Sequence, residues 1–209
     1  MRIPPPVQAL LWMAAARECL CAQEHLTLAV WNYAKVSRTE MAGAIRTARW
    51  AYRAAGIETD WPVCNVPAGD SSDCSEPLPA DGRYLELAVM RRRAKTLDAF
   101  WKGSNPAGLA LAGVEFPRPR AYVFYSTTNY AALLTVRPSD VVLGCVLVHE
   151  SAHLLGLRHE SRGVMRPWID AHNIDDVLAG RPFSPAEVRS LRAAVVRRQQ
   201  DARLVASRK

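Results

Sequence analysis

The chain has 209 residues, of which 49% are hydrophobic and 22% charged, and its formal net charge is +7. This usage is ordinary for a globular protein and excludes a fibrous or wholly disordered one. No apolar run is long enough to cross a bilayer, so we expect no transmembrane segment. The arginines are scattered and no basic motif is interleaved with aromatic residues, so we expect no specific nucleic-acid partner. Attraction of the basic surface to acidic polymers is the alternative.

The first residues have the pattern of an export signal. Arg2 precedes an apolar stretch from Val7 to Ala16, and the segment Cys19 to Ala22 offers small residues for cleavage. We interpret residues 1–24 as a signal peptide or, alternatively, an N-terminal extension. The first interpretation predicts a secreted or periplasmic protein, and the second a cytoplasmic one.

Five cysteines leave the cellular compartment open. Cys145 lies in an apolar run and is expected to be a buried thiol. Cys64 and Cys74 lie in a loop rich in Pro, Ser and Asp. A disulfide between them fits an exported protein, whereas two free thiols fit a cytosolic one.

The first part of the chain predicts a strand, a helix and a second strand. Leu26–Tyr33 is rich in β-forming residues and apolar on both faces, which is typical of a strand covered on both sides. Ser37 and Glu40 form a capping box before apolar residues at helical spacing, and Gly56 ends that helix. Ile57–Val63 predicts the second strand. This order favours a right-handed crossover onto a parallel pair.

Three further strands are expected after a loop from Pro62 to Gly82. Tyr84–Met90 alternates apolar residues with others and predicts a half-buried strand. Leu109–Val114 is short, apolar and flanked by glycines. Ala121–Ser126 is rich in β-forming aromatic residues, which we expect to pack in the core.

Two helices complete the expected fold. Pro138 or Ser139 opens a helix whose segment from Val141 to Val148 is apolar on almost every side, as a buried helix is. Ser184 and Pro185 start a C-terminal helix with apolar residues on one face.

The chemistry concentrates at the end of the buried helix. His149 and His153 are four residues apart, so their rings lie on one helical face and can reach one metal ion. Glu150 is rotated by about 100° from His149 and points beside the metal, where a general base belongs. Gly156 permits the positive φ that ends a helix, and the turn brings His159 round as a third ligand. Three ligands with an open fourth position are typical of a catalytic zinc site.

With its H-E-x-x-H-x-x-G-x-x-H pattern, this segment resembles the metzincin zinc peptidases, in which a methionine turn follows the third histidine. Gly163 to Pro167 resembles that turn, which implies that Met165 forms an apolar floor beneath the imidazoles. Glu160 is similar to the acid that follows the third histidine in astacins. The Met-x-Pro order is similar to matrixins, and no tyrosine lies two residues after the methionine. The subfamily is therefore open.

The resemblance also implies a substrate cleft. The segment Leu109–Val114 matches the family's edge strand, whose unpaired backbone groups can add an extended peptide. Arg166, Pro167 and Trp168 match the wall of the family's specificity pocket.

We therefore expect an α/β (α+β) fold: a metzincin-like twisted mixed sheet with an active-site helix, a backing helix and a C-terminal helix. Residues 25–200 would form the catalytic domain and residues 201–209 a basic tail. The expected function is hydrolysis of peptide bonds in a peptide or protein substrate by a monomer, with one Zn²⁺ on the three histidines and Glu150 as general base. One alternative is a zinc-dependent hydrolase of a non-peptide amide. The other is a non-enzymatic basic binding module with a relic zinc site, against which the intact Glu150 counts.

Overall fold

The computed structural model describes residues 24–65, 84–92, 106–111 and 119–207. Its strands form one twisted sheet in the order β2-β1-β4-β6-β5, with β3 also paired to β1. The strands are β1 (His25–Asn32), β2 (Glu58–Asp60), β3 (Val63–Asn65), β4 (Tyr84–Met90), β5 (Gly108–Leu111) and β6 (Arg120–Phe124). The helices are α2 (Arg38–Ala54), α3 (Tyr125–Thr135), α4 (Ser139–Leu154), α5 (Ala171–Leu178) and α6 (Pro185–Ala206). The expected mixed α/β architecture is confirmed.

The first unit is the expected crossover, in which β1 pairs in parallel with β2 and β3. The single strand predicted from Ile57 to Val63 is wrong, because the chain divides into β2 and β3 at Trp61-Pro62. Proline has no N–H to give to the sheet. Its carbonyl instead accepts the Val30 N–H at 2.8 Å, so β1 stays bonded across the break.

Helix α2 is capped by Ser37, whose side chain accepts the Glu40 N–H at 3.2 Å. The predicted reciprocal half of the capping box is replaced by a longer-range contact. The Glu40 carboxylate accepts a hydrogen bond from the Tyr125 hydroxyl at 2.7 Å. The cap of α2 is thereby joined to the start of α3.

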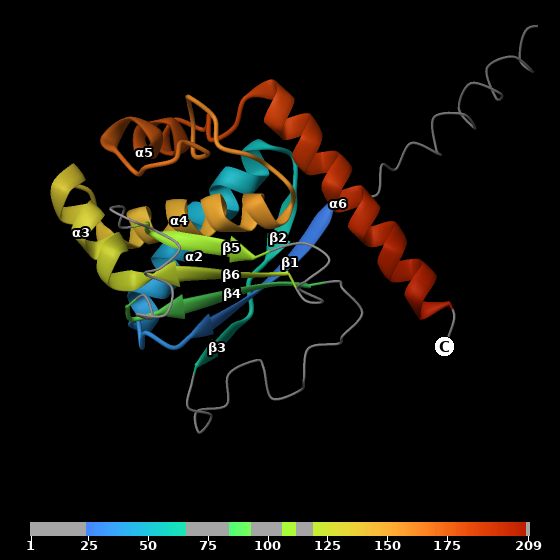
Figure 1. Cartoon of the computed structure of the whole chain (residues 1–209), viewed down its shortest axis with the longest axis horizontal. Helices are drawn as coiled ribbons and strands as arrows, with labels where there is room; N and C mark the ends of the chain where they lie inside the picture. Colours follow the sequence, from blue (N-terminus) through green and yellow to red (C-terminus); the bar gives the residue numbers. More distant parts are fainter. Residues whose placement is uncertain (1–23, 66–83, 93–105, 112–118, 208–209) are drawn as a thin grey trace, which may run out of the picture.

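Helices α2 and α4 cover the same face of the sheet (Figure 1). They approach closely because α4 has a glycine at their contact. A Cβ on Gly144 would lie 2.6 Å from the Ala44 carbonyl oxygen and 2.6 Å from the Thr47 Cβ. Helix α4 is buried along most of its length, as its all-round apolar sequence predicts.

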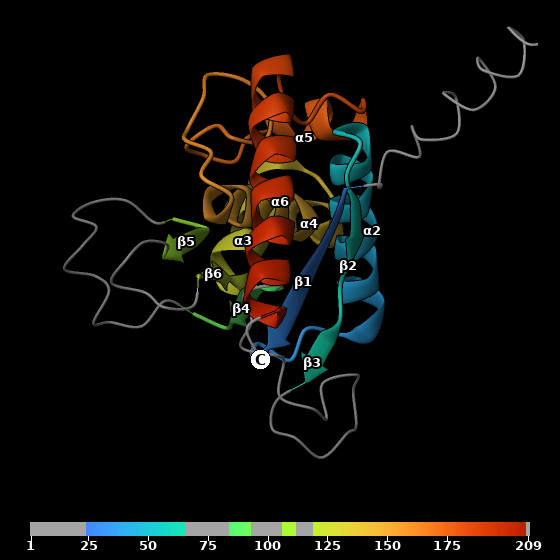
Figure 2. The ribbon, with the colours of Figure 1, turned by 90° about the vertical axis from the view of Figure 1, so that its right-hand side faces the viewer.

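The C-terminal helix α6 crosses the starting ends of β1 and β4 (Figure 2). Gln199 donates to the His25 carbonyl at 2.9 Å, and Arg198 donates to the Tyr84 carbonyl at 3.3 Å. The Leu191 and Val195 side chains are buried in the core. The helix continues to Ala206, into the segment interpreted as a basic tail.

Three local expectations are wrong. Strand β4 is buried on both faces, not one: Glu86 is only 9% exposed and is paired with Arg120 of β6. The last strand ends at Phe124, and the next residue begins α3, a helix that the sequence patterns did not predict. Helix α5 was also not predicted, and it carries the exposed His172.

Two sequence expectations fall outside the described residues. These are the export signal, because description begins at residue 24, and the position of Cys74. Cys64 is buried and disulfide-bonded, so its pairing with Cys74 stays a prediction. Cys145 is a free, buried thiol, as expected. Among the described helices, none has both the length and the apolar character needed to cross a bilayer.

Candidate metal centre

The turn that ends α4 carries the site. Leu155 closes the helix, and Gly156 follows with φ +90°, a left-handed conformation that favours glycine. The Gly156 N–H donates to the His153 carbonyl at 2.9 Å, and the Leu157 N–H donates to the Ala152 carbonyl at 3.0 Å. This pair of bonds is a Schellman motif, which reverses the chain sharply. The reversal brings His159 back beside the end of α4.

Three imidazoles converge there. The Nε2 atom of His153 lies 3.0 Å from that of His149 and 3.1 Å from that of His159. Among the described His, Cys, Asp and Glu residues, these three histidines form a group whose ligand atoms lie close enough together to hold one metal ion. Nitrogen ligands at about 2.0–2.1 Å from a tetrahedral zinc lie about 3.3 Å apart. The observed spacing therefore fits a shared ion with only a small expansion.

Backbone carbonyls fix the orientation of two of the rings. Nδ1 of His149 lies 2.7 Å from the Val164 carbonyl, and Nδ1 of His153 lies 2.8 Å from the Leu157 carbonyl. A carbonyl only accepts, so each Nδ1 carries the proton and each Nε2 presents a lone pair. Lone pairs crowded at this distance repel one another unless a cation lies between them. The donor set thus fits a metal ion.

Burial keeps these rings neutral. Desolvation lowers the pKa of His149 to about 4, and desolvation followed by the charge of His159 lowers the pKa of His153. Metal ligation requires the neutral imidazole. Both residues are therefore in the ligating form at neutral pH without having to lose a proton to the ion.

The loop after His159 supplies the carbonyl group that orients the His149 ring. The Glu160 N–H donates to the Met165 carbonyl at 2.9 Å, which closes the turn, and Met165 is fully buried. The Val164 N–H donates to the Pro182 carbonyl at 2.9 Å, while the Val164 carbonyl holds His149. The segment before α6 is therefore connected to His149 through the backbone of one residue, Val164. The floor role expected for Met165 stays a prediction.

Glu150 is buried against the edge strand. A Cβ on Gly108 of β5 would lie 2.5 Å from both Cγ and Cδ of Glu150, so only glycine leaves room for this side chain. Burial raises the pKa of Glu150 to about 8. A divalent cation at the adjacent histidines would favour the ionised carboxylate instead.

A cleft of about 910 Å³ opens over these residues. Its walls come from β5, α3, α4 and the loop that follows His159. The lining residues are Pro106, Ala107, Gly108, Leu109, Ala110, Thr127, Tyr130, Ala131, Leu134, Val146, His149, Glu150, His153, His159, Arg166, Pro167, Trp168 and Ile169.

Strand β5 is the edge of the described sheet along this cleft, and it is antiparallel to β6. The Phe124 N–H donates to the Ala107 carbonyl at 2.7 Å. Along an antiparallel strand, residues bonded to the neighbouring strand alternate with residues whose N–H and C=O groups point away from it. Leu109, two residues after Ala107, therefore bonds to β6, whereas Gly108 and Ala110 direct their N–H and C=O groups away from β6. Those two residues can pair with an added strand.

The structure brings together all four residues of the motif that we expected to act, and it lines the cleft with Arg166, Pro167 and Trp168. Arg166 is also paired with Asp170 at 2.9 Å. Sequence reasoning missed the wall provided by α3 and the clearance provided by Gly108. No apolar stripe at helical spacing indicates α3, because its large apolar residues are exposed and its buried residues are Thr128 and Ala132.

No family model matches this sequence, and no curated protein matches it. Solved structures do match its fold. One is metalloproteinase-II from Bacteroides fragilis, with 12% sequence identity over 81% of this chain and a TM-score of 0.52; the match covers 52% of that protein, so this chain spans about half its length. Another is archaemetzincin from Methanopyrus kandleri, with 17% identity over 84% of this chain and 98% of that one, and a TM-score of 0.48. The first of these matches shows that the chain shares the fold of that metalloproteinase.

Proposed function

We propose that this protein is a zinc-dependent endopeptidase of the metzincin type. The observation that carries the proposal is the convergence of three imidazole Nε2 atoms beside a buried glutamate. Three imidazole ligands suit zinc among the metals common in proteins, and three protein ligands leave a position for chemistry. The resemblance of the H-E-x-x-H-x-x-G-x-x-H segment to the metzincin signature also supports the proposal.

The edge strand supports a polypeptide substrate over a small amide. The outward backbone groups of Gly108 and Ala110 offer a row of donors and acceptors along the cleft. An extended peptide satisfies such a row by adding as a strand. A small amide would leave most of it unused.

Each residue has a defined part in the proposed reaction. Zinc, when bound, supplies a Lewis acid that polarises a carbonyl group and acidifies water. His149, His153 and His159 would hold the ion, and the carbonyl partners of His149 and His153 keep the Nε2 lone pairs of these two rings aimed at it. Glu150 takes the proton of the attacking water and delivers it to the leaving amine. Burial against Gly108 keeps the carboxyl group away from bulk solvent.

The test separates metal binding from chemistry. Glu150→Gln should retain the metal while its rate of peptide hydrolysis falls by about 10²–10⁴-fold. His153→Ala should lose both metal and activity. His172→Ala, which removes an exposed histidine outside the site, is the matched control and should change neither. Metal content is measured by elemental analysis and hydrolysis with a peptide library.

Two results would contradict the proposal. Wild-type turnover by Glu150→Gln would show that another group acts as base. Wild-type protein that takes up no zinc at neutral pH would show that the histidines serve another purpose.

A further inference from the structure

We propose that the substrate is a polypeptide with bulky apolar side chains on the C-terminal side of the scissile bond, and that these side chains bind the outward face of α3. This inference rests on the proposed endopeptidase function and deepens it. We call the surface the α3 apolar face; its members are Tyr130, Leu133, Leu134 and Val136.

The α3 apolar face is turned to solvent although its side chains are large. Leu133 is 77% exposed and Val136 is 83% exposed. The residues of α3 that are fully buried, Thr128 and Ala132, are smaller. This is the reverse of the usual arrangement, in which a surface helix buries its larger apolar residues. A contiguous exposed apolar surface commonly marks a binding site.

The face is continuous with the cleft. Tyr130 and Leu134 line the same cavity as His149 and Glu150. Leu133 lies next to them on the helix but outside that lining, so the apolar surface extends beyond the cavity. A substrate seated in the cleft is therefore the partner that meets this face.

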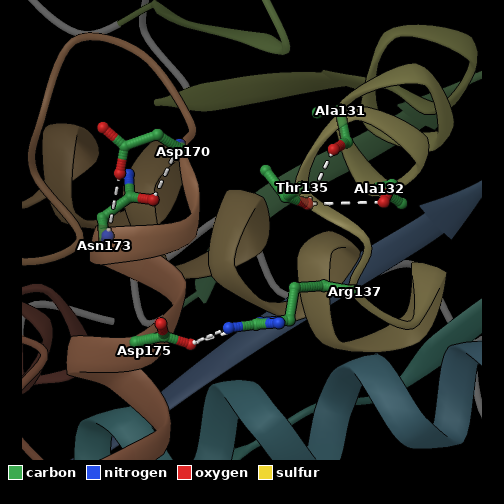
Figure 3. A network of polar contacts seen from close by, with 7 residues as sticks. All are labelled: Ala131, Ala132, Thr135, Arg137, Asp170, Asn173 and Asp175. Atoms are coloured by element: carbon green, nitrogen blue, oxygen red, sulfur yellow. Dashed lines mark hydrogen bonds and ion pairs between the residues drawn. The ribbon is translucent and has the colours of Figure 1, made fainter.

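The face carries no charge. Helix α3 contains no Asp, Glu, Lys or Arg, in a chain with 22% charged residues. The first charge after it, on Arg137, is paired with Asp175 of α5 at 2.7 Å (Figure 3). An apolar substrate segment fits such a surface, whereas a charged segment would lose water without gaining a partner.

The end of α3 is held in a costly conformation. Val136 caps the helix with φ +53° and ψ +47°, in the left-handed region that disfavours β-branched residues. The Thr135 hydroxyl donates to the Ala131 carbonyl at 2.7 Å and braces this turn (Figure 3). Strain of this kind is concentrated at functional surfaces. Glycine at this position would remove the strain but also the apolar side chain.

Helix α5 connects α3 with the opposite wall of the cleft. Its Asp175 binds Arg137 at the α3 end, and its Asn173 donates to the Trp168 carbonyl at 3.0 Å (Figure 3 shows the capping box of Asn173 with Asp170). The two walls are therefore fixed relative to each other through one helix. The position of the α3 apolar face beside the cleft is thus built into the fold.

Strand direction determines which part of the substrate reaches the face. Helix α3 starts where β6 ends, which is the Gly108 end of β5. Antiparallel pairing is the commoner and slightly stronger arrangement. A substrate strand antiparallel to β5 runs towards Gly108, so the residues after the scissile bond lie over α3.

The test uses two peptide mixtures with the same randomised core and different C-terminal tails, one rich in leucine and one made of serine and glycine. For the leucine-tailed mixture, Leu133→Ser should raise KM about tenfold, as loss of a leucine contact implies, and leave kcat unchanged. For the serine-glycine mixture it should change neither value. Leu204→Ser, the same substitution at an exposed leucine on α6, is the control and should leave both mixtures unaffected.

Binding of the labelled leucine-tailed mixture to Glu150→Gln, with and without Leu133→Ser, separates the two proposals. Binding that depends on Leu133 without any cleavage by the wild type supports the surface and refutes the peptidase. The inference is overturned if Leu133→Ser changes KM equally for both mixtures, or changes it for neither. The inference is also overturned if Leu133→Ser weakens binding only of peptides whose leucines precede the core, or only of lipid vesicles.

Discussion

The close approach of Gly108 to Glu150 predicts that one added methyl group, at a residue outside the histidine cluster, disables the proposed reaction. In Gly108→Ala, the new Cβ would lie 2.5 Å from Cγ and Cδ of Glu150. Carbon atoms pack at about 3.5–4.0 Å, so the side chain or the strand must move by about 1 Å. A displacement of about 1 Å at a catalytic group costs about 10²-fold in rate. We therefore expect kcat to fall about 100-fold.

Overpacking should also destabilise the fold by about 1–3 kcal/mol, and the control must separate that effect from the loss of rate. Gly144→Ala is the matched variant, because its Cβ would lie 2.6 Å from the Ala44 carbonyl oxygen, on the α2 side of α4. At a temperature where both variants are folded, Gly144→Ala should keep kcat. Zinc content should be normal in both, since none of the three atoms nearest to either added Cβ belongs to a histidine.

A double mutant tests the cause directly. Glu150→Ala removes the atoms that Gly108→Ala would strike, so the second substitution should cost little free energy of unfolding in that background. Urea denaturation gives all four free energies. An equal cost in both backgrounds, or wild-type kcat in Gly108→Ala, would refute the idea that this glycine positions Glu150.

Three further outcomes are expected. Gly163→Ala should weaken zinc affinity about 10–100-fold in a chelator competition, because its Cβ would strike the Pro182 carbonyl that supports the loop behind the site; unchanged affinity would show that this support is dispensable. Tyr52→Phe should lose about 1 kcal/mol of free energy of unfolding with the 2.7 Å hydrogen bond to Ser151, and a loss of zinc would contradict a purely structural role. Val136→Gly should gain about 1 kcal/mol by relieving the left-handed strain, and a lower melting temperature would count against that strain.

The convergence of the three histidines was predictable because its geometry is local. The spacing of His149 and His153 on one helix and the left-handed turn at Gly156 depend on neighbouring residues alone. Such patterns have the same geometry wherever they occur, so the sequence indicated three converging imidazoles before any fold was known. The long apolar run of α4 likewise predicted its burial.

Tertiary structure alone decided what surrounds that centre. Tyr125 and its aromatic neighbours favour a strand by propensity, yet the chain turns into α3 there, where the Tyr125 hydroxyl meets Glu40 of α2. Strand β4 is buried on both faces, and its Glu86 is paired with Arg120 of the neighbouring strand β6, which is far away in sequence. The room left for Glu150 likewise comes from a strand far away in sequence. Such contacts depend on which segments the folded chain brings side by side, and no local spacing records that.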